Sequence, residues 1–170
     1  QGAPSGPGKQ AIGKQIELES LQSAQAAAPL PRMQSDISEF DRVAGGGLVP
    51  GSATLIGGDP GIGKSTLLLQ LTCNLSKRGF RAAYISGEES ADQVRMRANR
   101  IGLANATVEL GTATNANDIA ASMTGPDRPD IVVIDSIQTM FWPSLDSAPG
   151  TVSQVRASAQ ELIRAAKNSR

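Results

Sequence analysis

Histidine is absent from the 170-residue sequence, and cysteine occurs once, at Cys73. One cysteine cannot form an internal disulfide, and without histidine or a cysteine cluster we expect no zinc site within these residues. Aromatic residues make up only 3% of the chain, which leaves little material for base-stacking platforms. The 16 basic residues balance the 16 acidic ones, so net charge neither supports nor excludes nucleic acid as a partner.

Long hydrophobic runs are also lacking. No stretch reaches membrane-spanning length and no signal-peptide pattern occurs, so we expect no membrane partner and a cytoplasmic location. The apolar content of 39% over 170 residues is compatible with one domain that buries a sizeable core.

The most informative stretch is residues 57–66, which read Gly-Gly-Asp-Pro-Gly-Ile-Gly-Lys-Ser-Thr. It fits the pattern G-x-x-x-x-G-K-[ST], and the apolar residues on either side predict a strand at 53–56 and a helix at 65–77. Strand, loop and helix in this order are typical of a nucleoside-triphosphate site. The predicted nucleotide-binding residues are Gly58, Asp59, Pro60, Gly61, Ile62, Gly63, Lys64, Ser65 and Thr66.

Each part of this loop has a physical role toward a polyanion. Glycines allow consecutive backbone N–H groups to turn inward around phosphate oxygens, and the helix start adds unpaired N–H groups and a positive dipole end. Lys64 is expected to reach the β- and γ-phosphates and Ser65 to contact magnesium. The sequence therefore predicts ATP and Mg²⁺ as ligands.

Two adjacent carboxylates, Glu88 and Glu89, follow a predicted buried strand at 81–86. The carboxyl ends of parallel strands form the edge that carries ligands, so one of these carboxylates could position or activate the water that attacks the γ-phosphate. The alternative is that the pair begins the next helix, where acidic residues suit the helix dipole. The local sequence leaves both interpretations open.

A second acidic position ends the run Asp130-Ile-Val-Val-Ile-Asp135. Its consecutive β-branched residues predict a fully buried parallel strand, and Asp135 at the end is expected to hold the magnesium shell beside Ser65. In the loop that follows, at 137–150, we interpret Trp142 as a packed anchor rather than a mobile contact surface.

Composition divides the chain in two. Residues 1–31 are rich in Gly, Pro, Ala and Gln and predict a flexible linker, whereas residues 32–170 carry the patterns of an α/β domain with a mainly parallel sheet flanked by helices. We expect Arg95, Arg97 and Arg100 to be solvated, with a subunit interface or phosphate contact as the alternative. The remaining expected elements are an amphipathic turn at 37–43 that buries Phe40 and Val43, helices at 90–101, 116–123 and 151–167, and a strand at 106–110.

Four stretches together resemble the RadA family of bacterial DNA repair proteins, also called Sms. The first is Glu39-Phe-Asp-Arg-Val-Ala-Gly-Gly-Gly-Leu-Val-Pro-Gly-Ser52 and the second is the phosphate loop with its helix; the others are Tyr84-Ile-Ser-Gly-Glu-Glu-Ser90 and Val133-Ile-Asp-Ser-Ile-Gln-Thr139. Residues 147–156 are similar to the family as well. The resemblance covers residues 36–170.

The resemblance implies a RecA-like P-loop ATPase core that works as a homo-hexameric ring on single-stranded DNA. It also implies ATP-driven branch migration of recombination intermediates, with a recombinase filament as a partner. Carried over to this chain, Glu88 would be the catalytic, water-activating glutamate, alongside Lys64.

The chain departs from the family pattern in four respects. The four-cysteine zinc finger, the Lys-Asn-Arg-Phe-Gly motif and the Lon-protease-like domain do not occur in it, so zinc is expected only in the finger. In a RecA-like sheet the strand at 53–56 pairs with one that would follow residue 170. The core is therefore expected to be incomplete at its C-terminal side, and we expect this stretch alone to bind nucleotide weakly, hydrolyse it poorly and aggregate.

Three other functions are compatible with the sequence. A KaiC-like clock protein or a replicative helicase would share the glycine hinge and the phosphate loop. A non-hydrolysing, nucleotide-gated binding module would use Glu88 and Glu89 only to start a helix.

Overall fold

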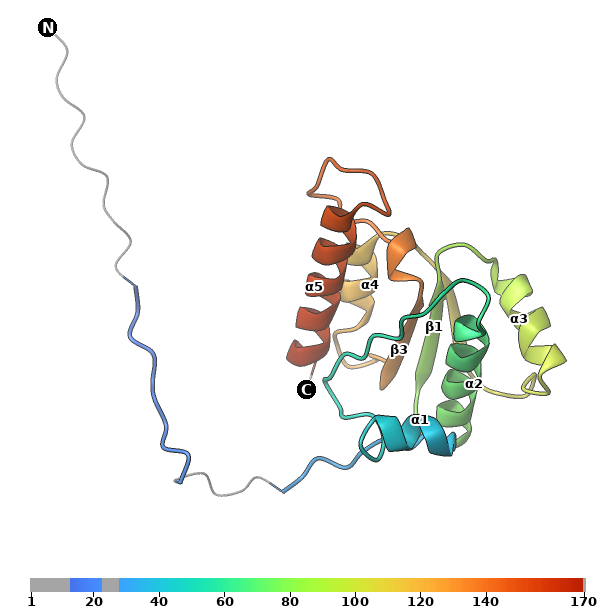
Figure 1. The fold of residues 1–170 in the computed structure, drawn as a ribbon, viewed down its shortest axis with the longest axis horizontal. Helices are drawn as coiled ribbons and strands as arrows, with labels where there is room; N and C mark the ends of the chain where they lie inside the picture. Colours follow the sequence, from blue (N-terminus) through green and yellow to red (C-terminus); the bar gives the residue numbers. More distant parts are fainter. Residues whose placement is uncertain (1–12, 23–27, 170) are drawn as a thin grey trace, which may run out of the picture.

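The computed structural model describes residues 13–22 and 28–169 (Figure 1). Part of the predicted linker, residues 1–12 and 23–27, lies outside the described residues. Residues 13–22 contain no helix or strand, and their apolar side chains Ile16, Leu18 and Leu21 are exposed. The division into linker and domain stays a prediction.

A three-stranded parallel sheet in the order β2-β1-β3 forms the centre of the fold. The strands are β1 (Ala82–Ser86), β2 (Glu109–Thr112) and β3 (Ile131–Asp135). The central strand β1 pairs with both neighbours, and its last residue, Ser86, is in register with Asp135. The predicted parallel α/β fold is confirmed.

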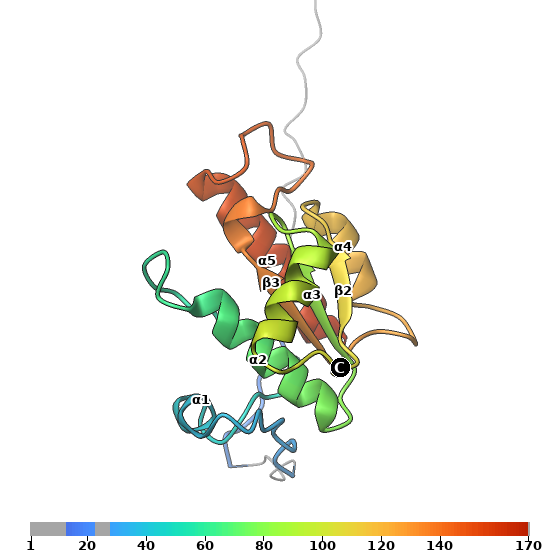
Figure 2. The same ribbon diagram turned by 90° about the vertical axis from the view of Figure 1, so that its right-hand side faces the viewer.

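Helices cover both faces of this sheet, as Figures 1 and 2 show. One face carries α2 (Lys64–Lys77) and α3 (Ala91–Arg100), and the other carries α4 (Ala116–Ser122) and α5 (Val152–Asn168). Two short helices complete the structure, α1 (Ser38–Val43) and the 3₁₀ turn η1 (Ile137–Thr139).

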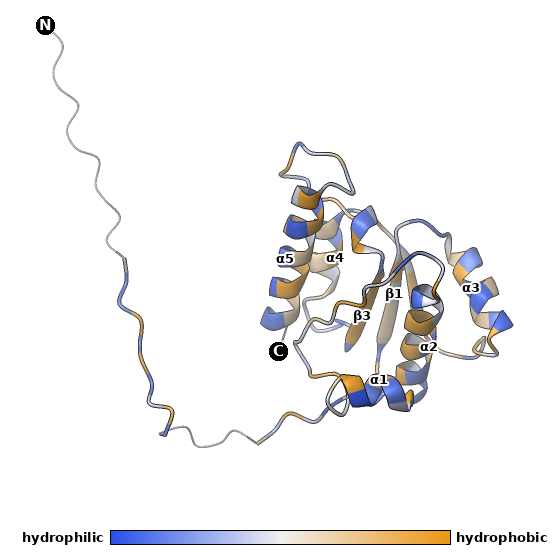
Figure 3. Ribbon diagram, in the orientation of Figure 1, coloured by the Kyte–Doolittle hydropathy of each residue, from blue (hydrophilic) through white to orange (hydrophobic). Residues whose placement is uncertain are grey.

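The alternation of side chains along the strands divides the core into two clusters. Tyr84 and Val133 point to the α2 and α3 face, where they join Leu69, Leu71, Leu75 and Val94. Ile85 and Ile134 point to the opposite face and pack with residues of α4, η1 and α5. Figure 3 shows α3 as a mainly hydrophilic helix, consistent with only Val94 being buried in it.

The predicted strand at 53–56 is wrong for this structure. Residues 52–59 contain no helix or strand, and Leu55 is 84% exposed. A strand exists only when a neighbour takes up its backbone hydrogen bonds, and no described segment pairs with this one. Among the described residues the sheet ends at β3, and residues 53–56 are not part of it.

Several buried faces also differ from expectation. Val43 is 74% exposed, because α1 ends there and only Phe40 of its predicted face packs inward. The buried stripe of α5 is rotated from the apolar one and includes the polar side chains of Gln154 and Ser158, while Ile163 is exposed. Strand β2 begins three residues later than predicted, at Glu109 instead of residue 106.

Candidate nucleotide-binding site

The predicted phosphate loop leads into the N-terminus of α2. Gly63, the N-cap residue, has a φ angle of 100°, and Gly61 has a φ angle of 81°. Residues other than glycine rarely adopt these positive φ angles. At Gly58 a Cβ atom would lie 2.5 Å from Ile62 Cδ1, the end of an exposed side chain that can move away. The backbone thus has the tight approach that a phosphate cradle needs, and its exposed position leaves it accessible.

Lys64 folds back over its own loop. Its Nζ donates hydrogen bonds to the carbonyl oxygens of Gly58 and of Asp59, the latter at 2.7 Å. The ammonium group therefore lies above the loop, where phosphate oxygens would replace neutral carbonyls as partners. Charge-assisted hydrogen bonds to phosphate are roughly twice as strong as neutral ones, so the exchange is favourable.

The carboxyl ends of β1 and β3 bring the predicted acidic residues to one edge. The backbone N–H of Gly87 donates to the Asp135 carbonyl oxygen at 3.0 Å, directly beyond the register pair of Ser86 and Asp135. Figure 1 shows that the start of α2, the turn after β1 and the η1 turn after β3 lie at the same end of the sheet. This is the end at which parallel sheets bind ligands.

The turn that carries Glu88 and Glu89 is held by Ser86. The Ser86 hydroxyl is buried and accepts the backbone N–H groups of Glu88 at 3.3 Å and Glu89 at 2.9 Å. The helix start lies one residue later: Ser90 is the N-cap of α3 and forms a capping box with Gln93. Neither glutamate is the cap, and both lie in the turn directly before the helix, so both interpretations of the pair stay open.

The two glutamates have different surroundings. Among the residues that the structure describes, the Glu88 carboxylate has no hydrogen-bond or ion-pair partner, and it is exposed. Glu89 accepts two hydrogen bonds from Arg97, at 2.7 Å and 3.0 Å. Arg97 is thus not the solvated residue that we expected, whereas Arg95 is exposed and pairs with Asp92.

Asp135 is joined to Tyr84, which lies on the neighbouring strand. The Tyr84 hydroxyl donates to Asp135 Oδ2 at 2.5 Å and accepts from Arg97 at 3.1 Å. Burial of the ring, and then the hydrogen bond to Asp135, raises the pKa of Tyr84 far above its ordinary value. The phenol therefore stays protonated and acts as a donor to the carboxylate at any physiological pH.

The site residues fit magnesium through the chemistry of their donors. Ser65 offers a hydroxyl and Asp135 a carboxylate, which are hard oxygen ligands, and Mg²⁺ in nucleotide sites takes its other ligands from phosphate and water. Within residues 13–22 and 28–169, no group of three or more His, Cys, Asp or Glu side chains could hold a metal ion. A magnesium–phosphate site of this type does not need such a group.

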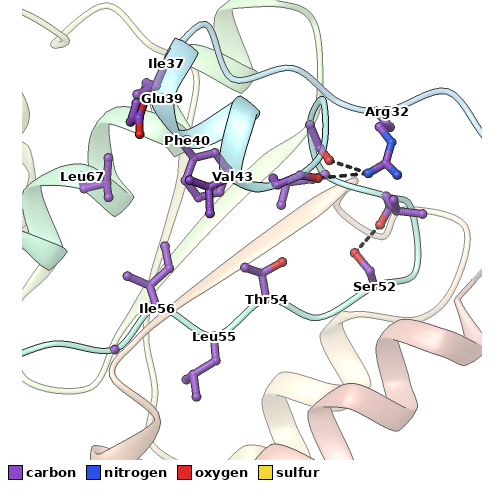
Figure 4. A pocket seen from close by; sticks show the side chains of 15 residues that line it. Arg32, Ile37, Glu39, Phe40, Val43, Ser52, Thr54, Leu55, Ile56 and Leu67 are labelled. Carbon is purple, nitrogen blue, oxygen red and sulfur yellow. Dashed lines mark hydrogen bonds between the residues drawn. The ribbon is translucent and has the colours of Figure 1, made fainter.

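A hollow of about 530 Å³ lies beside the phosphate loop and not within it. It is bounded by α1 and by the chain that leads into the loop, and Figure 4 shows Phe40 and Ile56 facing each other across it while Leu55 points away. Its lining is mostly apolar, and its arginine, Arg32, already donates to the carbonyl oxygens of Ala44 and Gly47. We therefore do not assign it to the phosphates.

Sequence reasoning assigned no site role to Tyr84, Ser86 or Gly87 and expected Arg97 to be solvated, although each contacts a predicted site residue or its neighbour. A further omission is Gln154, which is buried and ties the loop before α5 by accepting from the Trp142 N–H and donating to the Ser147 carbonyl oxygen. Trp142 itself is half-buried. The sequence carries no signal for this link, because Gln154 lies outside the apolar face that the helical periodicity predicts.

No helix among the described residues is long and apolar enough to cross a membrane. A parallel sheet with a glycine-rich loop at the start of a helix, and acidic residues at the same sheet edge, defines a P-loop nucleotide-binding domain. Residues 33–131, more than half of the chain, match the family described as "ATPase: KaiC". The chain belongs to this family.

Curated relatives confirm the resemblance to RadA. The chain is 56% identical over 159 residues to "DNA repair protein RadA" of Brucella abortus (strain 2308), covering 91% of this chain and 34% of that protein. It is 45% identical over 156 residues to "DNA repair protein RadA" of Bacillus subtilis (strain 168), covering 87% of this chain and 34% of that protein. The chain spans about a third of the length of these relatives.

Solved structures confirm the RecA-like fold. A DnaB-like replicative helicase, described with its interactions with primase, aligns with a TM-score of 0.65 at 16% identity over 85% of this chain and 43% of its own. A second structure, described as an ATPase domain, aligns with a TM-score of 0.66 at 18% identity over 84% of this chain and 62% of its own. At these identities the likeness concerns the fold alone.

Proposed function

We propose that this chain is the nucleotide-binding part of a DNA-dependent ATPase that drives branch migration of recombination intermediates. The observation that carries the proposal is that a phosphate loop, Asp135 and Glu88 lie at one end of a RecA-like sheet. Relatives named DNA repair protein RadA support the DNA repair role. A hexameric ring, single-stranded DNA and a recombinase filament as partners belong to the same proposal.

The residues divide the work by position. Lys64 exchanges the carbonyls of Gly58 and Asp59 for the β- and γ-phosphates, and the loop N–H groups bind the remaining oxygens. Ser65 and Asp135 would hold a magnesium ion, which would supply charge neutralisation when bound. Glu88, exposed and unpaired among the described residues, orients the attacking water and accepts its proton.

The first experiment is magnesium-dependent ATP hydrolysis by the full-length protein, with and without single-stranded DNA. Lys64→Ala serves as the blank, and we expect it to lower hydrolysis by about 100-fold or more, as the loss of a main electrostatic contact to the transferred group does. DNA stimulation that disappears in the blank supports the proposal. Hydrolysis that ignores DNA contradicts the recombination role.

A second candidate is a KaiC-like or replicative-helicase-type ATPase. The matched family description and the helicase-like fold favour it. Duplex unwinding without branch migration supports the helicase candidate, and hydrolysis insensitive to any DNA supports the KaiC-like one. A non-hydrolysing, nucleotide-gated module is the third possibility, for which Glu88→Gln would leave all activity unchanged.

A further inference from the structure

A chain of four polar side chains connects the two acidic positions of the site. Asp135 on β3 accepts from Tyr84 on β1, Tyr84 accepts from Arg97 on α3, and Arg97 donates to Glu89 in the turn after β1. Every link is 3.1 Å or shorter. Three separate elements thus contribute to one network that begins at the predicted magnesium carboxylate.

Burial distinguishes this network from the other ion pairs of α3. Tyr84 is fully buried, and the side chains of Arg97 and Glu89 are 21% and 31% exposed. The ion pair of Arg95 and Asp92 on the same helix is 63% and 86% exposed. Water therefore competes little for the Arg97 guanidinium, and its geometry is set by the two groups that it binds.

The network has a direct consequence for Asp135. Tyr84 holds Oδ2, which fixes the rotation of the carboxylate and leaves Oδ1 for the magnesium shell. Partners of this kind, one step behind the ligands, orient them and raise metal affinity. Because Arg97 donates to the Tyr84 hydroxyl oxygen, the hydroxyl proton of Tyr84 is directed toward Asp135.

The same network separates the two adjacent glutamates. Both oxygens of Glu89 are bound by Arg97, and the Ser86 hydroxyl fixes its backbone N–H. Glu88 shares the fixed turn but not the side-chain contacts. Because Arg97 holds the Glu89 side chain and the Ser86 hydroxyl holds its backbone N–H, Glu89 anchors the turn that presents Glu88.

We propose that Tyr84 and Arg97 are positioning residues that fix the magnesium-binding carboxylate of Asp135 and, through Glu89, the turn that presents Glu88. This inference rests on the proposed function in taking Asp135 as the magnesium residue and Glu88 as the water-activating one. The inference adds a mechanical link between Asp135 and Glu88, so that a displacement of α3 changes the positions of both carboxylates together.

The test uses the full-length protein and two readouts. The first is the affinity for fluorescent mant-ADP, measured with magnesium and with EDTA; the second is the magnesium concentration that gives half-maximal ATP hydrolysis. The variants are Tyr84→Phe, which removes only the hydroxyl, and Arg97→Lys, which keeps the charge but not the forked geometry. Arg95→Ala is the matched control, because its ion pair lies on the same helix and is exposed.

We expect Tyr84→Phe to raise the half-maximal magnesium concentration about tenfold, the lower end for loss of a supporting contact to a metal ligand. Arg97→Lys should shift it in the same direction and also lower kcat, and Arg95→Ala should behave as the unmodified protein. Affinity for mant-ADP in EDTA should be unchanged in all three. Arg97→Lys keeps the test decisive if Tyr84→Phe does not fold.

Magnesium dependence that is unaltered in both variants overturns the inference. Equal weakening of mant-ADP binding with magnesium and with EDTA also overturns it, because that pattern indicates general damage to the fold. The proposed function can fail separately. If the unmodified protein binds mant-ADP in a magnesium-dependent manner but does not hydrolyse ATP, the hydrolytic proposal is wrong. A shift in the magnesium requirement for mant-ADP binding in the variants would then still support the positioning role.

Discussion

Gly87 donates its backbone N–H to the carbonyl oxygen of Asp135 at 3.0 Å, which extends the pairing of β1 and β3 by one bond beyond the strands. The contact places the turn that carries Glu88 directly against η1. A Cβ atom on Gly87 would lie 1.8 Å from Thr139 Oγ1 and 2.7 Å from Thr139 Cβ. The absence of a side chain at Gly87 is therefore a condition for bringing the two acidic positions together.

We expect Gly87→Ala to destabilise the protein by about 1 to 3 kcal/mol, the usual cost of forcing an extra carbon into a packed site. Because the turn must move, ATP hydrolysis should fall as well. Urea denaturation and kcat measure the two effects. Gly111→Ala on β2 is the control, since its added carbon meets only Ile85 at an ordinary 3.6 Å; equal effects of the two substitutions would contradict the close-contact argument.

The two glutamates should respond differently to amide substitution. Glu88→Gln is expected to lower kcat by about 100-fold with little change in nucleotide affinity, because a water-activating carboxylate contributes to the chemical step. Glu89→Gln should have a smaller effect on kcat, since an amide oxygen can still accept one hydrogen bond from Arg97. Single-turnover hydrolysis measures the effect on the chemical step, and mant-ADP titration measures the effect on nucleotide affinity. The reverse order would assign the water-activating role to Glu89.

Cys73 is 2% exposed on α2, and burial raises the pKa of its thiol, an effect that the nearby Lys77 charge partly opposes. A raised pKa in the folded state favours the protonated form. The stabilisation is therefore complete below the ordinary value of 9.0 and is lost as the pH rises from there through the folded-state value. The pKa of Tyr84 is also raised in the folded state, so its contribution to stability is lost in the same direction, as the pH rises above the ordinary value of 10.0.

We therefore expect the free energy of unfolding to decrease above about pH 9, and less steeply in Cys73→Ala. Denaturant titrations at a series of pH values measure this slope. A thiol reagent such as DTNB should react with Cys73 only as fast as the protein opens, because the buried thiol is neutral and inaccessible. Rapid modification of the native protein at pH 8 would show that α2 is not packed as described.

The candidate site could be proposed from the sequence because its signals are local. The phosphate loop is one uninterrupted stretch, and the glycine positions, Lys64 and Ser65 follow from its spacing. Asp135 could be found because four β-branched residues before it identify a buried strand and its end. Glu88 and Glu89 were located in the same way, from the end of a predicted strand. Their different surroundings could not be predicted, because the two residues are adjacent and of the same type.

The segment at 53–56 illustrates what a local pattern does not contain. Its apolar residues favour a strand, yet a strand requires a neighbour, and whether one is present depends on residues far away in the chain. The face of α5 is similar: the helix was predicted to within one residue, but Gln154 and not Ile163 faces inward because the loop around Trp142 needs hydrogen bonds.

The sequence by itself determined the phosphate loop, the parallel α/β class and the positions of the acidic residues, because each is encoded in consecutive residues or in a short periodicity. Only the tertiary structure decided that the Glu88 carboxylate is exposed and that the Glu89 carboxylate is hydrogen-bonded to Arg97. Arg97 was expected in solvent, and it reaches Tyr84 and Glu89 because α3 packs against α2 and β2 with that side chain turned toward β1. Such pairing depends on the rotation of one element against another, which no local pattern specifies.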